Sequence, residues 1–532
     1  MGNFITNLYK APEINPKNNK ALSIPILNPL NKYGRNFHLA WLGFFVSFLS
    51  WFAFPPLLEH SIKKDLKLTS IDVANNNIAG LSATLIARFL LGPVCDSIGP
   101  RYCMVLVLIL GTIPTALVPL VHNIHGLHAI RFFIGLLGGS FIPCQMWTTN
   151  FFDKSVVGRA NALAGGWGNA GGGVAFFVLP LINDDLTRRG YDLSKSWKLS
   201  FVIGPMIILL VVAILTFVFG SDCPEGKWSE RSDILQIGVD VRKVDIVSIA
   251  SNHPALSNQV SRLPIDHKLS HKDDKIDDII GDSSTDTSNQ DQNLDIVQTR
   301  VGEVVNLDEI IEKPSLKSIL KTTFHYRTML TALPYFTTFG GELAVEAILT
   351  GLYVQRSGGQ WSQSYAGSWG SMLGLLNVVT RPLGGWISDL LYARFKTTKV
   401  KKFWLLFLGA MEGIFLIWIG LVPSLSVHGL IGALGVMCIF MEAGNGANFA
   451  LVPHVNKSHT GIVAGCTGAI GNLGGILFSL VFRFSIKNGV SEYMKGFWII
   501  GIVVVVINVG CGIIPIKEDR PDELNHEQKI DV

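Results

Sequence analysis

Apolar blocks of roughly 20 residues alternate with shorter polar segments along most of the chain. A helix needs about 20 apolar residues to cross a hydrocarbon layer about 30 Å thick. The pattern therefore predicts an all-α membrane protein with twelve transmembrane helices. We expect these helices near residues 37–58, 72–94, 102–121, 127–151, 158–182, 197–219, 324–354, 364–391, 402–422, 427–450, 459–484 and 494–515.

The segment between the sixth and seventh predicted helices has a different composition. Residues 221–322 contain few aromatic residues and include the polar stretch HKDDKIDDIIGDSSTDTSNQDQNLD. Such a segment cannot bury enough apolar area to offset the entropy of ordering, so we expect a disordered linker. The predicted organisation is a tail at 1–36, six-helix bundles at 37–220 and 323–516 on either side of the 221–322 linker, and a tail at 517–532.

The linker also carries hydroxyl residues among acidic ones, at Ser283, Ser284, Thr285 and Thr287. A regulatory kinase acting on this linker is one hypothesis, because phosphate would add charge there. A solvated tether without regulation is the other.

Basic residues in the short loops indicate the orientation of the chain. Arg101, Lys154, Arg159, Lys457 and the basic run at 394–402 fall on the side shared by the basic N-terminus. An even number of helices puts both termini on one side, and the positive-inside rule makes that side cytoplasmic. A few basic residues in the opposite loops do not follow the rule.

Composition excludes several classes of protein. The chain is 48% hydrophobic and only 16% charged, with a formal net charge of +4. These values do not fit an ordinary soluble protein, and they indicate the lipid bilayer, not nucleic acid, as the partner. The seven cysteines show neither CxxC nor Cys/His spacing, so we expect no metal site and no disulfide framework. We find no nucleophile–base pair or phosphate loop, and expect no enzyme and no cofactor.

An internal repeat is the most specific feature of the sequence. ARFLLGPVCD in the second helix matches TRPLGGWISD in the eighth, with Arg followed by Gly four residues later and Asp eight residues later. The fifth and eleventh helices each contain GNxGG, preceded by a glycine at the same interval. Two matches in the same order predict two pseudo-symmetric bundles around a site near the membrane midplane.

The repeat pairs two arginines, Arg88 and Arg381, deep inside predicted helices. A charged residue at that depth raises the free energy of membrane insertion by several kcal/mol, so it normally faces a cavity or a partner. Snorkelling to the membrane surface is one alternative. A structural ion pair is another, because four glutamates also lie inside predicted spans, namely Glu342, Glu346, Glu412 and Glu442. We favour convergence of both guanidinium groups on a small anion.

Other polar and aromatic residues extend this candidate site. Asn169 and Asn472 occupy equivalent positions in the repeat, and a buried amide can donate to an anion, whereas the neighbouring glycines are best explained by close helix packing. Tyr335, Phe339, Glu342 and Glu346 are spaced by four, three and four residues and share one helix face. Two glutamates on an aromatic face indicate that it lines a polar cavity.

The repeated motifs resemble those of a known family. GPVCDSIGPR is similar to the gate loop of the major facilitator superfamily, and a partial second copy follows the eighth helix. The gate positions are Gly92, Asp96, Gly99, Arg101, Gly385, Asp389 and Arg394. GWGNAGGG and GAIGNLGG, together with the two arginines, resemble the signatures of the nitrate/nitrite porter family, in particular its fungal high-affinity branch. The resemblance covers about four fifths of the chain and implies the major facilitator fold.

The resemblance also implies a substrate and roles for individual residues. Arg88 and Arg381 would clamp nitrate, with Asn169 beside it, while Tyr335, Phe339 and Phe141 shape the binding slot. Phe141 is identified by its distance of 28 residues before Asn169, and Asn472 is added by repeat symmetry. The implied function is import of nitrate, and of nitrite, across the plasma membrane by proton symport.

Physical chemistry agrees with this interpretation. Nitrate is planar, so guanidinium forks can meet its oxygens in one plane between flat rings. Moving a negative charge into a cell against about 100 mV costs about 2.3 kcal/mol, so accumulation needs more than one proton per nitrate. Glu342 and Glu346 are the candidate proton carriers. Nitrate/nitrite exchange, transport of another small anion, and a nitrate sensor with little flux are the alternatives.

Overall fold

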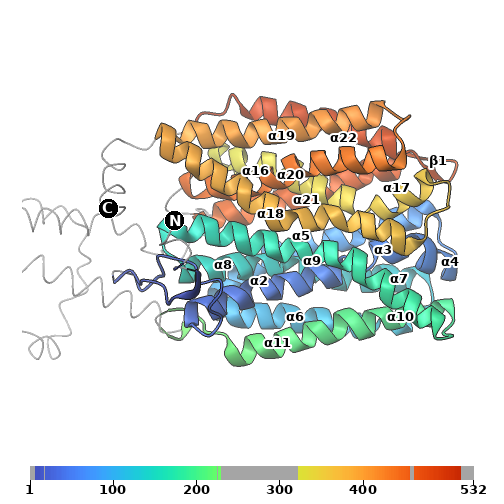
Figure 1. Ribbon diagram of the computed structural model, residues 1–532, viewed down its shortest axis with the longest axis horizontal. Coiled ribbons are helices and arrows are strands. Elements are labelled where there is room, and N and C mark those ends of the chain that lie inside the picture. Colours follow the sequence, from blue (N-terminus) through green and yellow to red (C-terminus); the bar gives the residue numbers. More distant parts are fainter. Residues whose placement is uncertain are drawn as a thin grey trace, which may run out of the picture. The chain divides into compact units, whose positions relative to one another are not determined.

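The computed structural model describes residues 6, 8–16, 18–224, 226–228, 321–455 and 460–516 (Figure 1). The described N-terminal half contains α2 (Lys32–Trp51), α3 (Pro55–Leu57), η1 (Leu58–Ile62), α4 (Lys63–Asp65), α5 (Ser70–Ile98), α6 (Pro100–Ala116), η2 (Val118–Leu120), α7 (Ile124–Gly135), η3 (Leu136–Ser140), α8 (Phe141–Phe151), α9 (Lys154–Arg188), α10 (Leu193–Phe201), η4 (Val202–Met206) and α11 (Ile207–Phe219). The C-terminal half contains α16 (Tyr326–Glu346), α17 (Leu349–Arg356), α18 (Gln363–Phe395), α19 (Thr398–Leu421), α20 (Val427–Val455), α21 (Thr460–Phe484), β1 (Ile486–Lys487), β2 (Val490–Ser491) and α22 (Tyr493–Cys511).

Each of the twelve predicted spans is helical in the described residues. Ten helical stretches there are long and apolar enough to cross a membrane. The other two predicted spans, 324–354 and 364–391, correspond to α16 with α17 and to α18. These two carry Glu342, Glu346 and Arg381 among many Gly, Ser and Thr residues, which lowers their apolar character. The predicted linker and C-terminal tail lie outside the described residues, apart from 221–224, 226–228 and 321–322.

Local sequence determines where several helices begin. Thr69 and Asp72 form a reciprocal capping box at the start of α5, and Ser362 accepts from the backbone N–H of Tyr365 at the start of α18. Gly99, with φ of +85°, separates α5 from α6. Only glycine adopts this conformation without strain, and Pro100 then occupies the first position of α6. A short antiparallel hairpin, β1 and β2, pairs Ile486 with Ser491 before α22.

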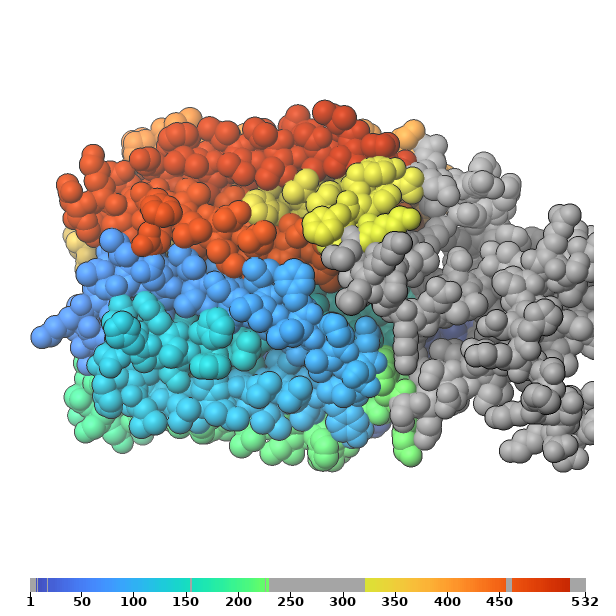
Figure 2. Space-filling model, turned by 180° about the vertical axis from the view of Figure 1, so that it is seen from behind, coloured from blue at the N-terminus to red at the C-terminus, as the bar shows by residue number. Residues whose placement is uncertain are grey.

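The two halves meet mainly where α9 packs on α18 and α5 packs on α21. Figure 2 shows the second of these contacts, with the blue N-terminal half against the orange-red C-terminal half. In the first contact, a Cβ on Gly166 would lie 2.6 Å from the carbonyl oxygen of Asn377. A Cβ on Gly173 would lie 2.7 Å from the backbone nitrogen of Leu375 and 2.9 Å from the carbonyl carbon of Gly374. The glycine motif therefore permits backbone contact between the halves.

Equivalent glycines also pack within each half. Gly171 faces the backbone of Phe45 in α2, and Gly474 faces the backbone of Phe336 in α16. One turn earlier in each motif, Gly168 faces the ring of Phe44 and Gly471 faces the ring of Tyr335. The repeat in the sequence is thus a repeat of contacts, in which α2 corresponds to α16.

Hydrogen bonds also join the halves at the end of the bundle where α2 and α3 finish and α18 starts. The backbone N–H of Ser61 donates to Gln363, Ser364 donates to Asp184, and Arg483 donates to Asn75. These bonds close the two halves together at that end, which Figure 1 shows opposite the marked N-terminus.

We predict that Gly166→Ala destabilises the protein by about 1–3 kcal/mol, because the new methyl group would overlap the Asn377 backbone of α18. Gly158→Ala, in the same helix with nothing within 4 Å of the added Cβ, is the matched control. It should be neutral or slightly stabilising, since alanine favours helix. Thermal unfolding of the purified variants tests this, and equal shifts in both would contradict the packing role.

Candidate functional site

Arg88 lies in the middle of α5 and is only 3% exposed. Its Nε donates to the carbonyl of Gly138 at 3.2 Å, and its Nη1 donates to the carbonyl of Gly468 in α21 at 2.8 Å. The guanidinium group also lies 4.8 Å from the ring centroid of Phe339 and 5.4 Å from that of Phe141. Nη2 has no hydrogen-bond partner in the part of the chain that the structure describes. Arg88 is therefore fixed in position by two helices while one donor stays available.

Arg381 lies in α18 and is 2% exposed. Its Nη2 donates to the hydroxyl of Tyr335 at 2.9 Å, and its Nη1 donates to Oδ1 of Asn377 at 3.4 Å. Its Nε side faces α9 near Gly165, where a Cβ would lie 3.5 Å from it. In the described residues no carboxylate forms an ion pair with either Arg88 or Arg381. A structural ion pair, the alternative explanation for these arginines, is therefore absent from this part of the chain.

One aromatic pair connects the two arginines. The rings of Tyr335 and Phe339 stack with centroids 4.9 Å apart and an interplanar angle of 6°. Tyr335 bonds Arg381, and Phe339 lies against Arg88. Both guanidinium groups thus converge on the same stacked pair, although they come from different halves of the chain.

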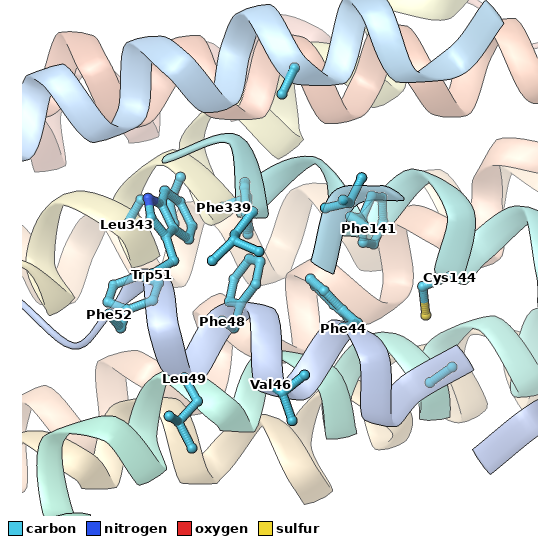
Figure 3. Close-up of a cluster of buried hydrophobic side chains, with 14 of the residues drawn as sticks. Phe44, Val46, Phe48, Leu49, Trp51, Phe52, Phe141, Cys144, Phe339 and Leu343 are labelled. Carbon is cyan, nitrogen blue, oxygen red and sulfur yellow. The ribbon is translucent and has the colours of Figure 1, made fainter. Parts of the chain in front are cut away.

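More rings surround this pair. Phe449 of α20 makes edge contacts with Tyr335 at 5.2 Å and with Phe141 at 5.3 Å. Figure 3 shows Phe44 and Phe48 pointing from α2 toward Phe141 and Phe339. The environment of the arginines is therefore apolar on several sides, which strengthens any electrostatic interaction within it.

Glu342 lies one turn beyond Phe339 and is held by three amides. Its Oε1 accepts from Asn377 at 2.9 Å and from Asn169 at 3.2 Å, and its Oε2 accepts from Asn445 at 2.8 Å. These amides come from α18, α9 and α20, so one carboxyl group ties three helices to α16. Asn377 bonds both Arg381 and Glu342 and therefore separates the cation from the carboxyl group.

The other three buried glutamates have fewer partners. Glu346 is 2% exposed with an unpartnered Oε1, and Glu412 is fully buried with neither oxygen partnered. Glu442 accepts from Asn445 at 3.2 Å, while its second oxygen has no partner. All four glutamates belong to the C-terminal half, on α16, α19 and α20. Acidic and basic groups are thus unevenly divided between the halves.

Asn472 is buried but does not join this network. Its Nδ2 donates to the carbonyl of Leu81 in α5 at 2.7 Å, and its Oδ1 has no partner. Asn169, its equivalent in the repeat, instead reaches Glu342. The structure therefore brings together the predicted residues Arg88, Arg381, Asn169, Tyr335, Phe339, Phe141 and Glu342, whereas Asn472 joins the halves elsewhere and Glu346 lies one turn away from Glu342.

Comparison with known proteins identifies the family of a chain with this fold and this buried charge. The profile of the Major Facilitator Superfamily matches residues 40–479. The chain belongs to this superfamily. It is a superfamily of transporters, which agrees with the prediction that this protein is not an enzyme.

Several relatives in the superfamily have names that give a substrate. High affinity nitrate transporter 2.5 of Arabidopsis thaliana is 28% identical over 467 residues, which cover 87% of this chain and 76% of the relative. Nitrate/nitrite transporter NrtP of Nostoc punctiforme is 25% identical, covering 85% and 87%. Elsinochrome transporter 1 of Elsinoe fawcettii is 30% identical over 522 residues, covering 97% and 99%. The predicted resemblance to nitrate/nitrite porters is confirmed.

Solved structures support the fold alone. The proton:xylose symporter XylE superposes with a TM-score of 0.59 at 13% identity, covering 90% of this chain and 95% of that one. A bacterial homolog of the human lysosomal transporter Spinster gives a TM-score of 0.55 at 15% identity, with the same two coverages. The predicted major facilitator fold is confirmed.

The predicted gate motifs of the superfamily lie at the ends of α5 and α18. Arg101 pairs with Asp222 at 3.4 Å and donates to the carbonyl of Phe217. Asp389 accepts from Lys401 at 2.7 Å. Each copy therefore forms charged contacts within its own half, while Arg394 is exposed and Gly92 has open space around it. Their role in gating stays a prediction.

Three residues that bond Glu342 or pack against the aromatic rings of the site were missing from the sequence prediction. They are Asn377, Asn445 and Phe449. Asn377 lies four residues before Arg381 and so shares its helix face. Asn445 follows Glu442 by three residues, and Phe449 follows Asn445 by four. Spacing from an intramembrane charge was therefore the signal that could have identified all three.

We predict that Tyr335→Phe lowers the free energy of unfolding by about 1–3 kcal/mol, because Nη2 of the buried Arg381 would lose its acceptor. Tyr353→Phe is the control, since the Tyr353 side chain is equally buried but its hydroxyl has no partner among the described residues. That variant should unfold at an unchanged or higher temperature. Thermal unfolding without added anions separates the two, and a stable Tyr335→Phe protein would refute the orienting role.

Proposed function

We propose that this chain imports nitrate together with protons across the plasma membrane, by alternating access and with both termini in the cytoplasm. The observation that carries the proposal is the convergence of Arg88 and Arg381 on one stacked aromatic pair. Both cations are buried, and neither has a carboxylate ion pair among the residues that the structure describes. Nitrite, a smaller planar anion of the same charge, suits the same groups.

The charges favour an anion at this position. Arg88 and Arg381 contact the two rings of one stacked pair, so their like charges lie close to each other. An anion between them would relieve this repulsion and would satisfy the unpartnered Nη2 of Arg88. The two like charges, otherwise separated mainly by neutral rings, therefore give an anion a strong reason to bind.

The shape of the site favours a thin anion. Tyr335 and Phe339 present nearly parallel rings, and guanidinium forks bond planar oxygen groups edge-on. Relatives named as nitrate transporters agree with this choice, but one relative is named for elsinochrome. The choice of nitrate as the substrate is therefore argued from the arginines and the aromatic rings more than from similarity to the named relatives.

Protons are needed because an anion enters a negatively charged cell at a cost of about 2.3 kcal/mol per 100 mV. Glu342 is the first candidate carrier, since Asn377 links it to Arg381 through two hydrogen bonds. Glu346, one turn further along α16 and buried with an unpartnered oxygen, is the second. Nitrate would cancel part of the positive field at Glu342, so anion and proton would bind cooperatively and reciprocally.

Arg88→Lys and Arg381→Lys should each reduce nitrate uptake into proteoliposomes at least about tenfold, because lysine keeps the charge but loses a fork worth about 1.5–3 kcal/mol. Arg189→Lys, in an exposed ion pair with Asp185, is the matched control and should transport normally. Near-normal uptake by both site variants at equal reconstitution would disprove the nitrate clamp. Binding without uptake in the unaltered protein would favour the sensor.

Glu342→Gln and Glu346→Gln should weaken the dependence of nitrate uptake on an imposed pH gradient more than they weaken nitrate binding. Glutamine has nearly the same shape and keeps one acceptor oxygen but cannot carry a proton, and Glu492→Gln, at an exposed position before α22, serves as the control. If both variants still concentrate nitrate under a pH gradient as the unaltered protein does, the protons travel elsewhere. Uptake that instead requires internal nitrite would identify an exchanger.

A further inference from the structure

A third buried arginine lies outside the proposed nitrate site. Arg131 belongs to α7 and is 3% exposed. Its Nη1 donates to the carbonyl of Trp51, and its guanidinium group lies 5.3 Å from the ring centroid of Phe54. Its Nε has no hydrogen-bond partner. One carbonyl and one ring are little compensation for a buried full charge.

The described residues provide no carboxylate for Arg131. No ion pair involves it, and the four intramembrane glutamates belong to the other half. The nearby carboxylate of Asp72 accepts from the N–H and the hydroxyl of Thr69 at the exposed start of α5. The buried acids of this half, Asp153 and Asp222, are bonded to other groups near the opposite end of the helices. The buried positive charge of Arg131 therefore favours binding of a counter-ion from solution.

Unpartnered polar groups occur on the two helices that contact Arg131, α5 and α2. Its Nε lies against Gly80 of α5, where a Cβ would be 2.8 Å away. Asn76, one turn earlier on the same face, is fully buried, and neither its amide nitrogen nor its oxygen has a partner. The indole N–H of Trp51, a residue whose carbonyl contacts Arg131, is also unpartnered. Each buried polar group of this kind destabilises the folded protein by about 1–3 kcal/mol if it has no hydrogen-bond partner.

We propose that Arg131 and Asn76 form an outer binding site for a small monovalent anion, which nitrate occupies before it reaches Arg88 and Arg381. The cation and the amide N–H are donors, so an anion satisfies both, whereas a cation would be repelled. Trp51, whose carbonyl accepts from Arg131, and Leu343, which follows Glu342 in α16, belong to one cluster of buried apolar side chains (Figure 3).

The position of the outer site fits a step on the way in. Asn76 precedes Arg88 by 88 − 76 = 12 residues on α5, which is about 18 Å along a helix. It lies toward the end where Asn75 accepts from Arg483 and the halves are joined. That end is external in the proposed orientation, so this inference rests on the proposed function for the direction of movement and for nitrate as the occupant.

Counting bound anions tests the proposal. Equilibrium dialysis of the purified full chain with isotope-labelled nitrate should give two nitrate ions per chain, and one in Arg131→Gln. Arg189→Gln removes the same charge from an exposed ion pair and should retain two. Equal counts in the unaltered protein and in Arg131→Gln would overturn the outer site. Unlabelled chloride should displace nitrate from the Arg131-dependent site, and failure to do so would contradict a general monovalent anion site.

Transport adds a second measurement. Arg131→Gln should raise the nitrate concentration for half-maximal uptake about tenfold, which corresponds to about 1.4 kcal/mol, with maximal uptake changed by less than about twofold. An unchanged half-maximal concentration would overturn the outer site. Should Arg131→Gln fail to fold, Asn76→Ala must weaken one of the two binding events while Arg131 is retained, and two unweakened events would refute the proposal.

These measurements also separate failure of the outer site from failure of the proposed function. If Arg88→Lys and Arg381→Lys both transport nitrate normally, the nitrate clamp is wrong. The anion that depends on Arg131 would still be counted by dialysis with radiolabelled chloride. If only the outer site is wrong, Arg381→Lys reduces uptake at least about tenfold, while Arg131→Gln changes neither the number of bound nitrate ions nor the uptake.

Discussion

Backbone contact through glycine determines how the helices of this protein are arranged. Gly166 and Gly173 let α9 approach α18 at backbone distance, and Gly171 and Gly474 do the same for the first helix of each half. A side chain at any of these positions would move a helix by about the size of a methyl group or more. Asn169 lies on α9, and Asn377 and Arg381 lie on α18. Their hydrogen bonds across the interface therefore depend on the glycines that bring these helices together.

The division of charge between the halves is the second constraint. Arg88 and Arg131 belong to the N-terminal half, which buries no carboxylate beside them among the described residues. The C-terminal half holds Arg381 and four buried glutamates. A charge buried without a partner is costly, so each half favours a different mobile ion. The cationic half favours anions, and the acidic half favours protons, which agrees with the proposed co-transport of nitrate and protons.

Much of this arrangement could be predicted from the sequence because the repeat identifies equivalent positions. The pairing of Arg88 with Arg381, and the shared face of Tyr335, Phe339 and Glu342, follow from spacing alone. Spacing from Arg381 and Glu442 places Asn377, Asn445 and Phe449 on the same helix faces as these charges, but their role depends on partners in α16 and α8, which spacing along one helix does not show.

The difference between Asn169 and Asn472 illustrates the limit of symmetry. The glycine contacts make Phe44 equivalent to Tyr335, so seven residues later Trp51 is equivalent to Glu342. Asn169 finds a carboxyl group across the interface, whereas Asn472 has no such group at the equivalent place and bonds the Leu81 carbonyl instead. The backbone contacts are repeated in both halves, but the side chains at equivalent positions differ. The partner of each asparagine therefore depends on the sequence of another helix and cannot be predicted from its own motif.

The amide of Asn377 between Arg381 and Glu342 also affects how fast the protein can work. A direct buried ion pair would have to separate whenever an anion takes its place, and breaking such a pair costs about 3–5 kcal/mol. At about 1.4 kcal/mol per factor of ten, that barrier would slow each cycle roughly a hundredfold or more. A neutral amide exchanges partners without separating opposite charges, so the site can release its contents at a rate set by helix movement and not by electrostatic trapping.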